Sequence, residues 1–564
     1  MSRRAAAGLE VLTAVLLGAT LVAAYSGPLR FDLFGTSLSI RSLSRPLLAA
    51  TLIFALRLWW LRGPSFLTSA PNAMARVLSG ALITAGVIGW ITYNSPTVGG
   101  ADSYGYVSAA ERLLAGDLVH DEPLAAILPA NGARVSTPLG YVPSGRTANA
   151  SVPAYPLGLP AVMALAIATF GPTAPFFVAP VCGVLLLVVV YLTASFWFHD
   201  RQAALLASGL VALHPLVFTY SIQPMSDVPA AAALMAAVAA LSRVPSRPVL
   251  AGCAAALTLM IRPALAPAAF ALAFLPLASI GRPGLSTALW YVGPVIAGAV
   301  VQGCTQWYLY GDALASGYGS VSGLFSLETP RLNLRSYLYW GFLALGPVWL
   351  AGLAAGVASS ARLPRVAVTL LVLGVSAPYL FYRPYDHWET LRFLLPALVA
   401  ATVLAAFGLL AVSRRVAGQA SGALIAALIA MAIAYTWMSW LTANRVFDMR
   451  EHEARHRLVG ALVARVTPEH AVILALQHSG SVRYYAHRET LNWNHIPAGQ
   501  FTPTVRAVQA RGLPVFLLID SDEERVIFET QHGPVVANEG WLPGGQYRNV
   551  QLFEAAGQPA GQVH

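Results

Sequence analysis

Lysine is absent from this sequence, so all 35 basic side chains are arginine. The absence excludes Schiff-base chemistry and a catalytic lysine, and any phosphate site must be built from guanidinium groups. Cysteine is scarce, and the three cysteines, Cys182, Cys253 and Cys304, fall in or beside apolar runs. The polar segments therefore contain no disulfide framework.

Charged residues are also few, at 11% of the chain against 57% hydrophobic residues. The apolar residues form runs long enough to cross a bilayer, so we expect a polytopic α-helical membrane protein. The net charge of +10 comes from arginines dispersed singly or in pairs between these runs. That dispersal is typical of topology signals, and we predict a lipid bilayer and no nucleic acid as partner.

The apolar runs predict about thirteen membrane spans. We divide the chain into N-terminal transmembrane helices with a short outer hairpin (1–77), a transmembrane core (78–440) with a long outer loop (95–156), and a polar segment (441–564). The runs lie near 9–27, 46–61, 78–94, 175–197, 203–222, 227–242, 249–263, 264–280, 287–309, 341–358, 365–381, 391–412 and 420–440.

Arginines gather in the connections on one side of these spans, whereas most acidic residues fall on the other side. Because arginine marks the cytoplasmic side, the acidic side faces outward. We expect an integral protein of the inner or cytoplasmic membrane, with its active site on the periplasmic or extracellular face.

From about residue 441 the sequence changes to an ordinary globular pattern. Runs at 472–476, 515–519 and 550–553 predict strands, and helices are expected near 478–486, 502–511 and 521–530. Strands alternating with helices indicate a small C-terminal α/β domain, and an odd span count makes it extracytoplasmic.

The long outer loop opens with Asp102-Ser-Tyr-Gly-Tyr, just after an apolar run. A carboxylate at the depth where a membrane helix meets water is only partly solvated, which suits a general base. The apolar stripe of Val107, Ala110, Leu113 and Leu114 predicts an amphipathic helix along the membrane surface. The alternative is that Asp102 caps this helix, because aspartate is favoured at N-caps.

Three further outer connections carry acids and aromatic residues: around Asp227, between Tyr308 and Tyr339, and from Phe381 to Arg392. Helices bring all four connections to one membrane face, where they can form a single pocket. A water-soluble acceptor would enter it from above and a lipid-linked donor from the side.

Six short motifs follow one another on this predicted outer side. They are Asp102-Ser-Tyr-Gly-Tyr, Tyr155-Pro-Leu-Gly-Leu-Pro160, Gln223-Pro-Met-Ser-Asp-Val-Pro229, Leu259-Met-Ile-Arg-Pro263, Tyr310-Gly-Asp-Ala-Leu-Ala-Ser-Gly-Tyr318 and Leu391-Arg-Phe-Leu-Leu-Pro396. Through them residues 80–410 resemble the GT-C superfamily of polyprenyl-phosphate-sugar-dependent glycosyltransferases. The resemblance is to the branch that holds protein O-mannosyltransferases and the lipid A aminoarabinose transferase.

The resemblance implies a membrane glycosyltransferase that moves a hexosyl or pentosyl group from undecaprenyl phosphate, or a similar carrier, to an extracytoplasmic glycan, lipid or protein. It implies that Asp102 is the general base and that Asp227 orders the site. Relatives can carry a lysine where this chain has Tyr155, so the donor-phosphate contacts are expected from arginine. The candidates are Arg146, Arg262, Arg383 and Arg392. No cofactor is predicted, and no metal site, although a divalent metal remains open.

The substrate pocket is predicted from the aromatic and polar residues of the same connections. Its members are Tyr104, Tyr106, Tyr155, Tyr318, Asp386 and His387. The alternative for single tyrosines is a place in the aromatic belt of the membrane interface. Asp227 can also cap the helix that follows it, and Arg262 can extend its guanidinium group to an interface.

Two other functions compete with this hypothesis. A transporter or flippase of lipid-linked sugars would show an internal repeat and ionisable residues at mid-membrane depth, whereas here they cluster at the ends of spans. A zinc metalloprotease is suggested by His452-Glu-Ala-Arg-His456, which matches the H-E-x-x-H signature. Arg455 beside the metal and the charged flanks typical of a solvated helix oppose it.

Overall fold

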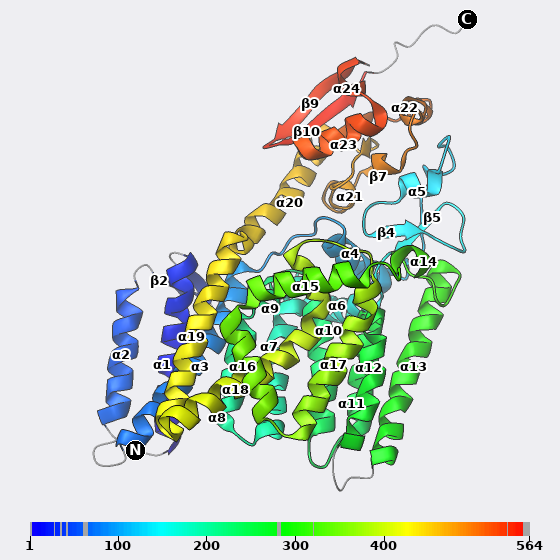
Figure 1. Ribbon diagram of the computed structural model, residues 1–564. Helices are drawn as coiled ribbons and strands as arrows, with labels where there is room; N and C mark the ends of the chain where they lie inside the picture. Colours follow the sequence, from blue (N-terminus) through cyan, green and yellow to red (C-terminus); the bar gives the residue numbers. More distant parts are fainter. Residues whose placement is uncertain are drawn as a thin grey trace, which may run out of the picture. The chain divides into compact units, whose positions relative to one another are not determined.

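The computed structural model describes residues 3–26, 29–33, 36–40, 43–59, 66–278, 284–319, 321–538 and 540–556. Its chain divides into two compact units (Figure 1). Unit 1 comprises Met1–Asn94, Phe177–Val300 and Leu324–Asp448, and unit 2 comprises Ser95–Phe176, Val301–Gly323 and Met449–His564. The long outer loop and the C-terminal segment therefore belong to one unit, whereas the three-part division made from the sequence stays a prediction.

Unit 1 is a bundle of helices built from the apolar runs. Its helices are α1 (Arg3–Ser26), α2 (Ser44–Trp59), α3 (Phe66–Tyr93), α7 (Pro175–Phe198), α8 (Arg201–Leu213), α9 (Pro215–Ser221), α10 (Asp227–Ser242), α11 (Pro248–Ile261), α12 (Ala266–Ala271), α13 (Gly284–Tyr310), α15 (Pro330–Leu345), α16 (Pro347–Ser359), α17 (Arg362–Phe381), α18 (Leu395–Ala417) and α19 (Gln419–Ala443). The end of α13, from Val301 onward, belongs to unit 2. Short 3-10 turns lie at Pro263–Leu265, Leu272–Phe274, Pro276–Ala278, Trp388–Leu394 and Val446–Asp448. The predicted N-terminal hairpin is confirmed as antiparallel strands β1 (Leu29–Leu33) and β2 (Thr36–Ile40).

Seven helices of the described chain are long and apolar enough to cross a membrane, or up to nine if each of two bent pairs is one span. One bent pair is α8 with α9, and the other is α15 with α16, which meet at 104°. The predicted span at 341–358 is thus broken at Gly346, whose φ of 81° lies in the left-handed region that favours glycine. Four shorter apolar helices complete the set, and the count of thirteen stays a prediction.

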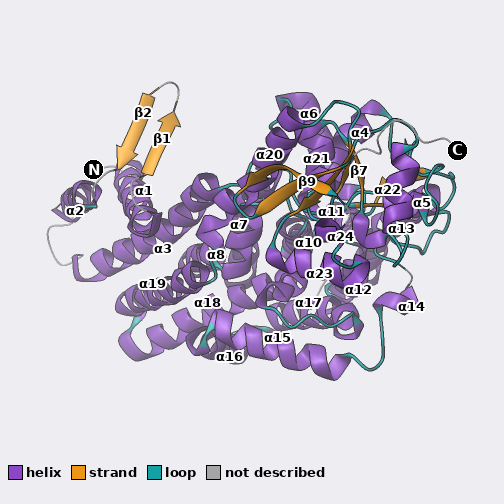
Figure 2. Cartoon of the chain, turned by 90° about the horizontal axis from the view of Figure 1, so that it is seen from above, coloured by secondary structure: helices purple, strands orange, loops and turns teal. Residues whose placement is uncertain are grey.

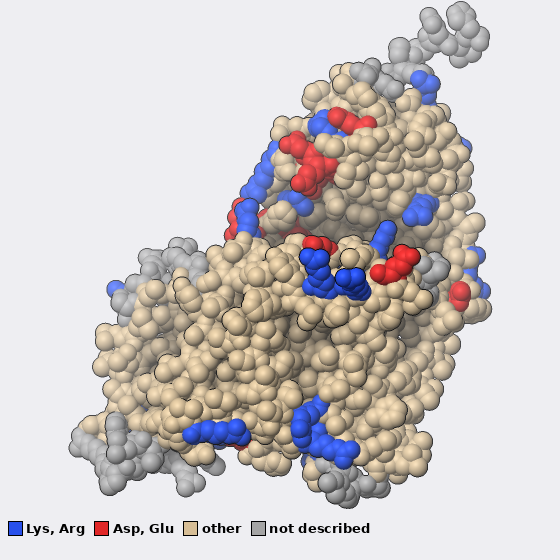
Figure 3. Space-filling model, viewed as in Figure 1, with Lys and Arg blue, Asp and Glu red and all other residues tan. Residues whose placement is uncertain are grey.

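Charge and small residues organise the bundle. On the face shown in Figure 3, charged side chains of unit 1 lie near the ends of the helices, with an uncharged band between them. Helices α16 and α18 approach so closely at Gly408 that an added Cβ atom there would lie 2.0 Å from the Gly352 carbonyl oxygen. Such contacts through small residues are typical of membrane helices.

Unit 2 combines helices with two sheets. All strands of the chain are drawn in orange in Figure 2. Its elements are α4 (Asp102–Ala115), β3 (His120–Asp121), α5 (Gly132–Ser136), β4 (Tyr141–Pro143), β5 (Ala150–Pro153), α6 (Gly158–Phe170), α20 (Met449–Val466), β6 (Val472–Leu474), α21 (Ser479–Ala486), β7 (Glu489–Leu491), a 3-10 turn (Trp493–His495), α22 (Phe501–Gln509), β8 (Val515–Ile519), α23 (Asp522–His532), α24 (Val535–Asn538), β9 (Trp541–Tyr547) and β10 (Val550–Ala555). The short helix α14 (Val321–Leu324) lies at the boundary with unit 1.

The larger sheet has strand order β7-β6-β8-β10-β9. Strand β6 pairs in parallel with β7 and β8, whereas β10 pairs antiparallel with β8 and β9. The three strands and three helices predicted for this segment are present, and β7 and β9 are additional. Strands β3, β5 and β4 form a separate antiparallel sheet in the outer loop.

The outer loop and the C-terminal sheet share one hydrophobic core. Leu124 and Val135 of the loop belong to the same buried cluster as Leu517 of β8 and Trp493. Arg483 of α21 binds the buried Glu122 with both terminal nitrogens, at 2.9 and 2.8 Å. The loop is therefore part of the folded unit.

Candidate functional site

Asp102 begins helix α4, which confirms the predicted helix but not the capping alternative. Ala101 occupies the N-cap position, and no side chain makes a capping bond there within the described residues. Instead, Ser103 closes the preceding turn, because its hydroxyl accepts a 2.8 Å hydrogen bond from the Gly99 N–H. The helix ends at Gly116, whose φ of 72° suits a left-handed C-cap.

The first half of α4 is buried on all sides, which differs from the amphipathic surface helix expected from the sequence. Residues 103–110 are all buried, because α21 packs on one side and the β4–β5 region on another. The Tyr104 ring contacts the backbone at Gly480, where a Cβ atom would lie 2.4 Å from a ring carbon. Burial raises the pKa of Tyr104. Tyr104 is thus a packing residue of unit 2.

Three other predicted pocket tyrosines do come together beside Asp102. The ring centroids of Tyr106 and Tyr155 are 4.6 Å apart, and those of Tyr155 and Tyr318 are 5.7 Å apart. Tyr106 and Tyr155 are buried, whereas Tyr318 is half exposed. Burial, followed by the charge of Asp102, raises the pKa of Tyr155 well above its usual value. We call Asp102, Tyr106, Tyr155 and Tyr318 the tyrosine cluster.

Arg146 has a different partner in unit 2. It is exposed, and its guanidinium carbon lies 4.3 Å from the ring centroid of Trp307, in cation–π geometry.

In unit 1 the second predicted acid, Asp227, is paired with Arg262. Asp227 opens α10, Arg262 follows the end of α11, and these two adjacent helices bring the side chains into a hydrogen-bonded salt bridge. Asp227 is 1% exposed, and a carboxylate buried to this degree needs a cation or hydrogen bonds. The sequence predicted both residues but not their pairing.

Arg262 and Arg392 gather around one phenyl ring. Their guanidinium carbons lie 5.7 and 5.5 Å from the centroid of Phe393, and Arg392 also lies 5.6 Å from the ring of Tyr220. We call Asp227, Arg262, Arg392, Phe393 and Tyr220 the arginine cluster. The sequence did not predict Phe393 and Tyr220 as site residues, although Phe393 belongs to the same motif as Arg392.

The remaining candidates of unit 1 are Arg383, Asp386 and His387, and all three residues are exposed. Arg383 is exposed, and its N–H donates a 2.9 Å hydrogen bond to the Leu324 carbonyl. Asp386 accepts a 2.9 Å hydrogen bond from the indole N–H of Trp340, and His387 lies 3.6 Å from Glu389.

The H-E-x-x-H sequence lies on α20, as expected, but its second histidine packs inside unit 2. The His456 ring stands 4.6 Å from that of His478, and it lies against Gly99 at the start of the outer loop. Burial lowers the pKa of His456 to about 2. Arg455 is bound to Asp520 at 3.1 Å. Among the described residues no three His, Cys, Asp or Glu side chains are grouped to hold a metal ion.

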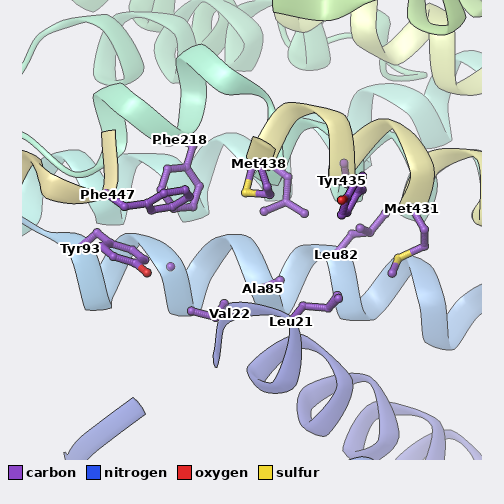
Figure 4. Close-up of a pocket in the computed structure, with 13 residues that line it drawn as sticks. Leu21, Val22, Leu82, Ala85, Tyr93, Phe218, Met431, Tyr435, Met438 and Phe447 are labelled. Carbon is purple, nitrogen blue, oxygen red and sulfur yellow. The ribbon is translucent and has the colours of Figure 1, made fainter. Parts of the chain in front are cut away.

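Unit 1 also contains an apolar cavity of about 150 Å³ (Figure 4). Tyr93, Phe218 and Phe447 line one end, and Met431 and Met438 lie along α19. None of the predicted site residues lines it. The candidate residues therefore fall into two groups, the tyrosine cluster within unit 2 and the arginine cluster within unit 1.

Comparisons with known proteins bear on this arrangement. Residues 155–307 match the model of the dolichyl-phosphate-mannose-protein mannosyltransferase family. No curated protein sequence matches the chain. The fold is similar to that of ArnT from Cupriavidus metallidurans in the apo state, at a TM-score of 0.51 and 12% identity over 85% of this chain and 98% of that chain.

Two further structures with bound ligands are similar. ArnT from Cupriavidus metallidurans bound to undecaprenyl phosphate matches at a TM-score of 0.53 and 11% identity, over 86% of this chain and 98% of that chain. The oligosaccharyltransferase AglB from Archaeoglobus fulgidus, in complex with an inhibitory peptide and a dolichol-phosphate, matches at 0.50 and 13%, over 85% and 74%. These likenesses show that the chain shares its overall fold with these proteins.

Proposed function

We propose that this integral membrane protein is a glycosyltransferase that passes a sugar from a polyprenyl-phosphate carrier to an acceptor outside the cytoplasm. The observation that carries the proposal is the arginine cluster. Two guanidinium groups lie near one aromatic ring at the ends of helices, and in a chain without lysine guanidinium groups must supply the phosphate contacts. The family match over 155–307 and the fold similarity support the same reaction class.

In the proposed reaction the acceptor hydroxyl oxygen attacks the anomeric carbon of the donor sugar. Asp102 takes the hydroxyl proton, and the bond between the anomeric carbon and the phosphate oxygen breaks. Polyprenyl phosphate leaves, and Arg262 and Arg392 stabilise its charge. Asp227 holds Arg262 in place through their salt bridge. Arg146, Arg383, Asp386 and His387 are assigned a supporting role in binding substrate.

Orientation and extent are part of the proposal. The arginine-rich connections face the cytoplasm, so the two clusters and the C-terminal α/β segment face the periplasm or extracellular space. About thirteen spans would be formed if the bent pairs and shorter apolar helices also cross or enter the bilayer. The transferred group is a hexosyl or pentosyl unit, and the acceptor is a glycan, lipid or protein. No cofactor enters the proposed reaction.

The test is transfer of label from radiolabelled polyprenyl-phosphate sugars to membrane fractions, with wild type and Asp102→Asn at matched expression. We expect transfer by Asp102→Asn to fall by about 10²- to 10⁴-fold with donor binding retained, because the general base is lost. Asp117→Asn is the matched control, since Asp117 is half exposed and pairs with Arg112 near the far end of α4. Its transfer rate should stay within about twofold of wild type.

Equal transfer by wild type and Asp102→Asn would assign Asp102 another role. Wild type that transfers no sugar, yet moves the labelled carrier across vesicle membranes, would identify a transporter of lipid-linked sugars instead.

A further inference from the structure

Tyr155 occupies a position that Gly105 makes possible. Tyr155 follows β5, is 5% exposed, and its ring lies flat against the backbone of α4 at Gly105. A Cβ atom at position 105 would lie 2.4 Å from two ring carbons of Tyr155, a separation that real Cβ atoms do not tolerate. Glycine at 105 is therefore required by the tyrosine ring beside it.

The spacing along α4 then places Tyr155 next to Asp102. Residues three apart on a helix share a face, so the side chain of Asp102 stands over the same surface as Gly105. A side-chain hydrogen bond with Asp102 is among the causes that raise the pKa of Tyr155. The residue before Tyr155 is itself held in the loop, because the Ala154 N–H donates a 3.0 Å hydrogen bond to the Gly140 carbonyl.

Neighbouring rings hold Tyr155 in that orientation. Tyr106 packs on it from α4, and Tyr318 packs edge-on from the segment after α13. Gly317 lets the chain before Tyr318 approach the backbone next to Tyr155. An added Cβ atom at Gly317 would lie 2.2 Å from the carbonyl oxygen of Ala154. Two glycines, at 105 and 317, thus bracket Tyr155.

We propose that Tyr155 is a positioning residue for Asp102: its hydroxyl keeps its proton and donates a hydrogen bond that orients the carboxylate toward the acceptor hydroxyl. This inference rests on the proposed function. Tyr155 stands where members of the resembling family can carry a lysine. In this chain it orients the Asp102 carboxylate.

The surroundings agree with a phenol that stays protonated. After burial, the leading influences on Tyr155 come from Asp102, Tyr318 and Tyr106. Burial and these neighbours raise the pKa of Tyr155. The hydroxyl is therefore a donor at every pH at which a glycosyltransferase would be assayed.

The test compares Tyr155→Phe with Tyr484→Phe in the full chain. Tyr484 donates a 2.7 Å hydrogen bond to Glu111 on the same helix, so the control removes the same kind of contact away from Asp102. The first readout is the pH midpoint of carbodiimide labelling of Asp102, followed by peptide mass spectrometry, which needs no activity. The second is the pH–rate profile of sugar transfer.

Removing a donor to a charged group disfavours the charged form. We expect the labelling midpoint of Asp102 and the acidic limb of the rate profile to move to higher pH in Tyr155→Phe. The transfer rate at saturating donor should fall about ten- to a hundred-fold, with the KM for donor little changed. Tyr484→Phe should match wild type in both readouts. Gly105→Ala should reproduce the Tyr155→Phe shift, because it displaces the ring.

Equal labelling midpoints in wild type and Tyr155→Phe contradict the inference even if transfer is observed. A rise in the KM for donor without a pH shift would instead assign Tyr155 to donor binding. A wild-type chain that transfers no sugar contradicts the proposed function, whatever the midpoints are.

Discussion

Buried carboxylates in this chain are accommodated in two different ways. Asp227 and Glu122 each face an arginine, whereas Glu524 accepts hydrogen bonds from the N–H groups of Asp520 and Gln477. Burial outweighs those bonds and raises the pKa of Glu524 to about 7. Burial also acts to raise the pKa of Asp520, but its hydrogen bond with His478 and the nearby positive charges lower it. The pKa of Glu524 is therefore raised, whereas the pKa of its neighbour Asp520 is lowered.

Glu524→Gln tests the first of these effects. The folded-state pKa of Glu524 lies above its usual value of 4.5, so its stabilising contribution is complete below about pH 4.5 and is lost as pH rises through about 7. The loss amounts to up to about 3 kcal/mol. We expect the Tm of wild type in detergent to fall between pH 5 and pH 8, and that of Glu524→Gln to change less. Glu529→Gln, on the exposed side of the same helix, should keep the wild-type slope.

A Glu524→Gln variant with an unchanged slope would mean that Glu524 is already charged throughout this range. Asp520 contributes in the other direction, because a depressed pKa gives stability that is lost only as pH falls below its usual range.

Helix packing in unit 1 depends on a few close backbone approaches. Helix α18 follows directly after the 3-10 turn that carries Arg392, and it packs on α16 through Gly408, Gly352 and Gly356. A Cβ atom at Gly408 would lie 2.3 Å from the Gly356 nitrogen. The position of the arginine cluster thus depends on how closely α18 can approach α16.

Gly408→Ala should therefore destabilise the bundle, although alanine favours helices. Forcing extra volume into packed helices costs about 1–3 kcal/mol, so we expect a lower Tm and reduced sugar transfer. The matched control is Gly341→Ala in α15, where a Cβ atom meets nothing within 4 Å. It should keep or slightly raise the Tm, because alanine gains up to about 1 kcal/mol over glycine in a helix. Equal Tm changes in the two variants would show that the α16–α18 approach is not limiting.

At the scale of the whole molecule, the outer loop and the C-terminal segment act as one folded unit. Arg483 donates hydrogen bonds to Glu122, to Thr490 and to the Ser136 carbonyl. Glu122 also accepts a 2.7 Å hydrogen bond from the Ser151 hydroxyl. Because Asp102 and Tyr155 lie in this unit, the C-terminal segment supports the proposed base although it is far away in sequence.

Arg483→Leu should disrupt that support. It leaves Glu122 buried without its cation, which costs about 3–5 kcal/mol in comparable sites. We expect faster proteolysis of the loop around residues 122–139 and loss of transfer, read by limited proteolysis and the label assay. Arg548→Leu is the control, since Arg548 pairs with Glu451 on the surface. Intact loop protection in Arg483→Leu would contradict the coupling, and partial recovery in Glu122→Leu/Arg483→Leu would support it.

The sequence by itself determined the membrane class, most helices and the strands at 472–474, 515–519 and 550–555, because hydrophobic runs and alternation are local signals. It also named Asp102, Asp227, Arg262 and Arg392 as candidates. Only the tertiary structure decided which side chains meet. Asp227 and Arg262 are separated by 35 residues, and Glu122 and Arg483 by 361. Such pairings follow from the packing of whole elements, and so do the contact of Tyr155 with Gly105 and the burial of the first half of α4, which no local pattern encodes.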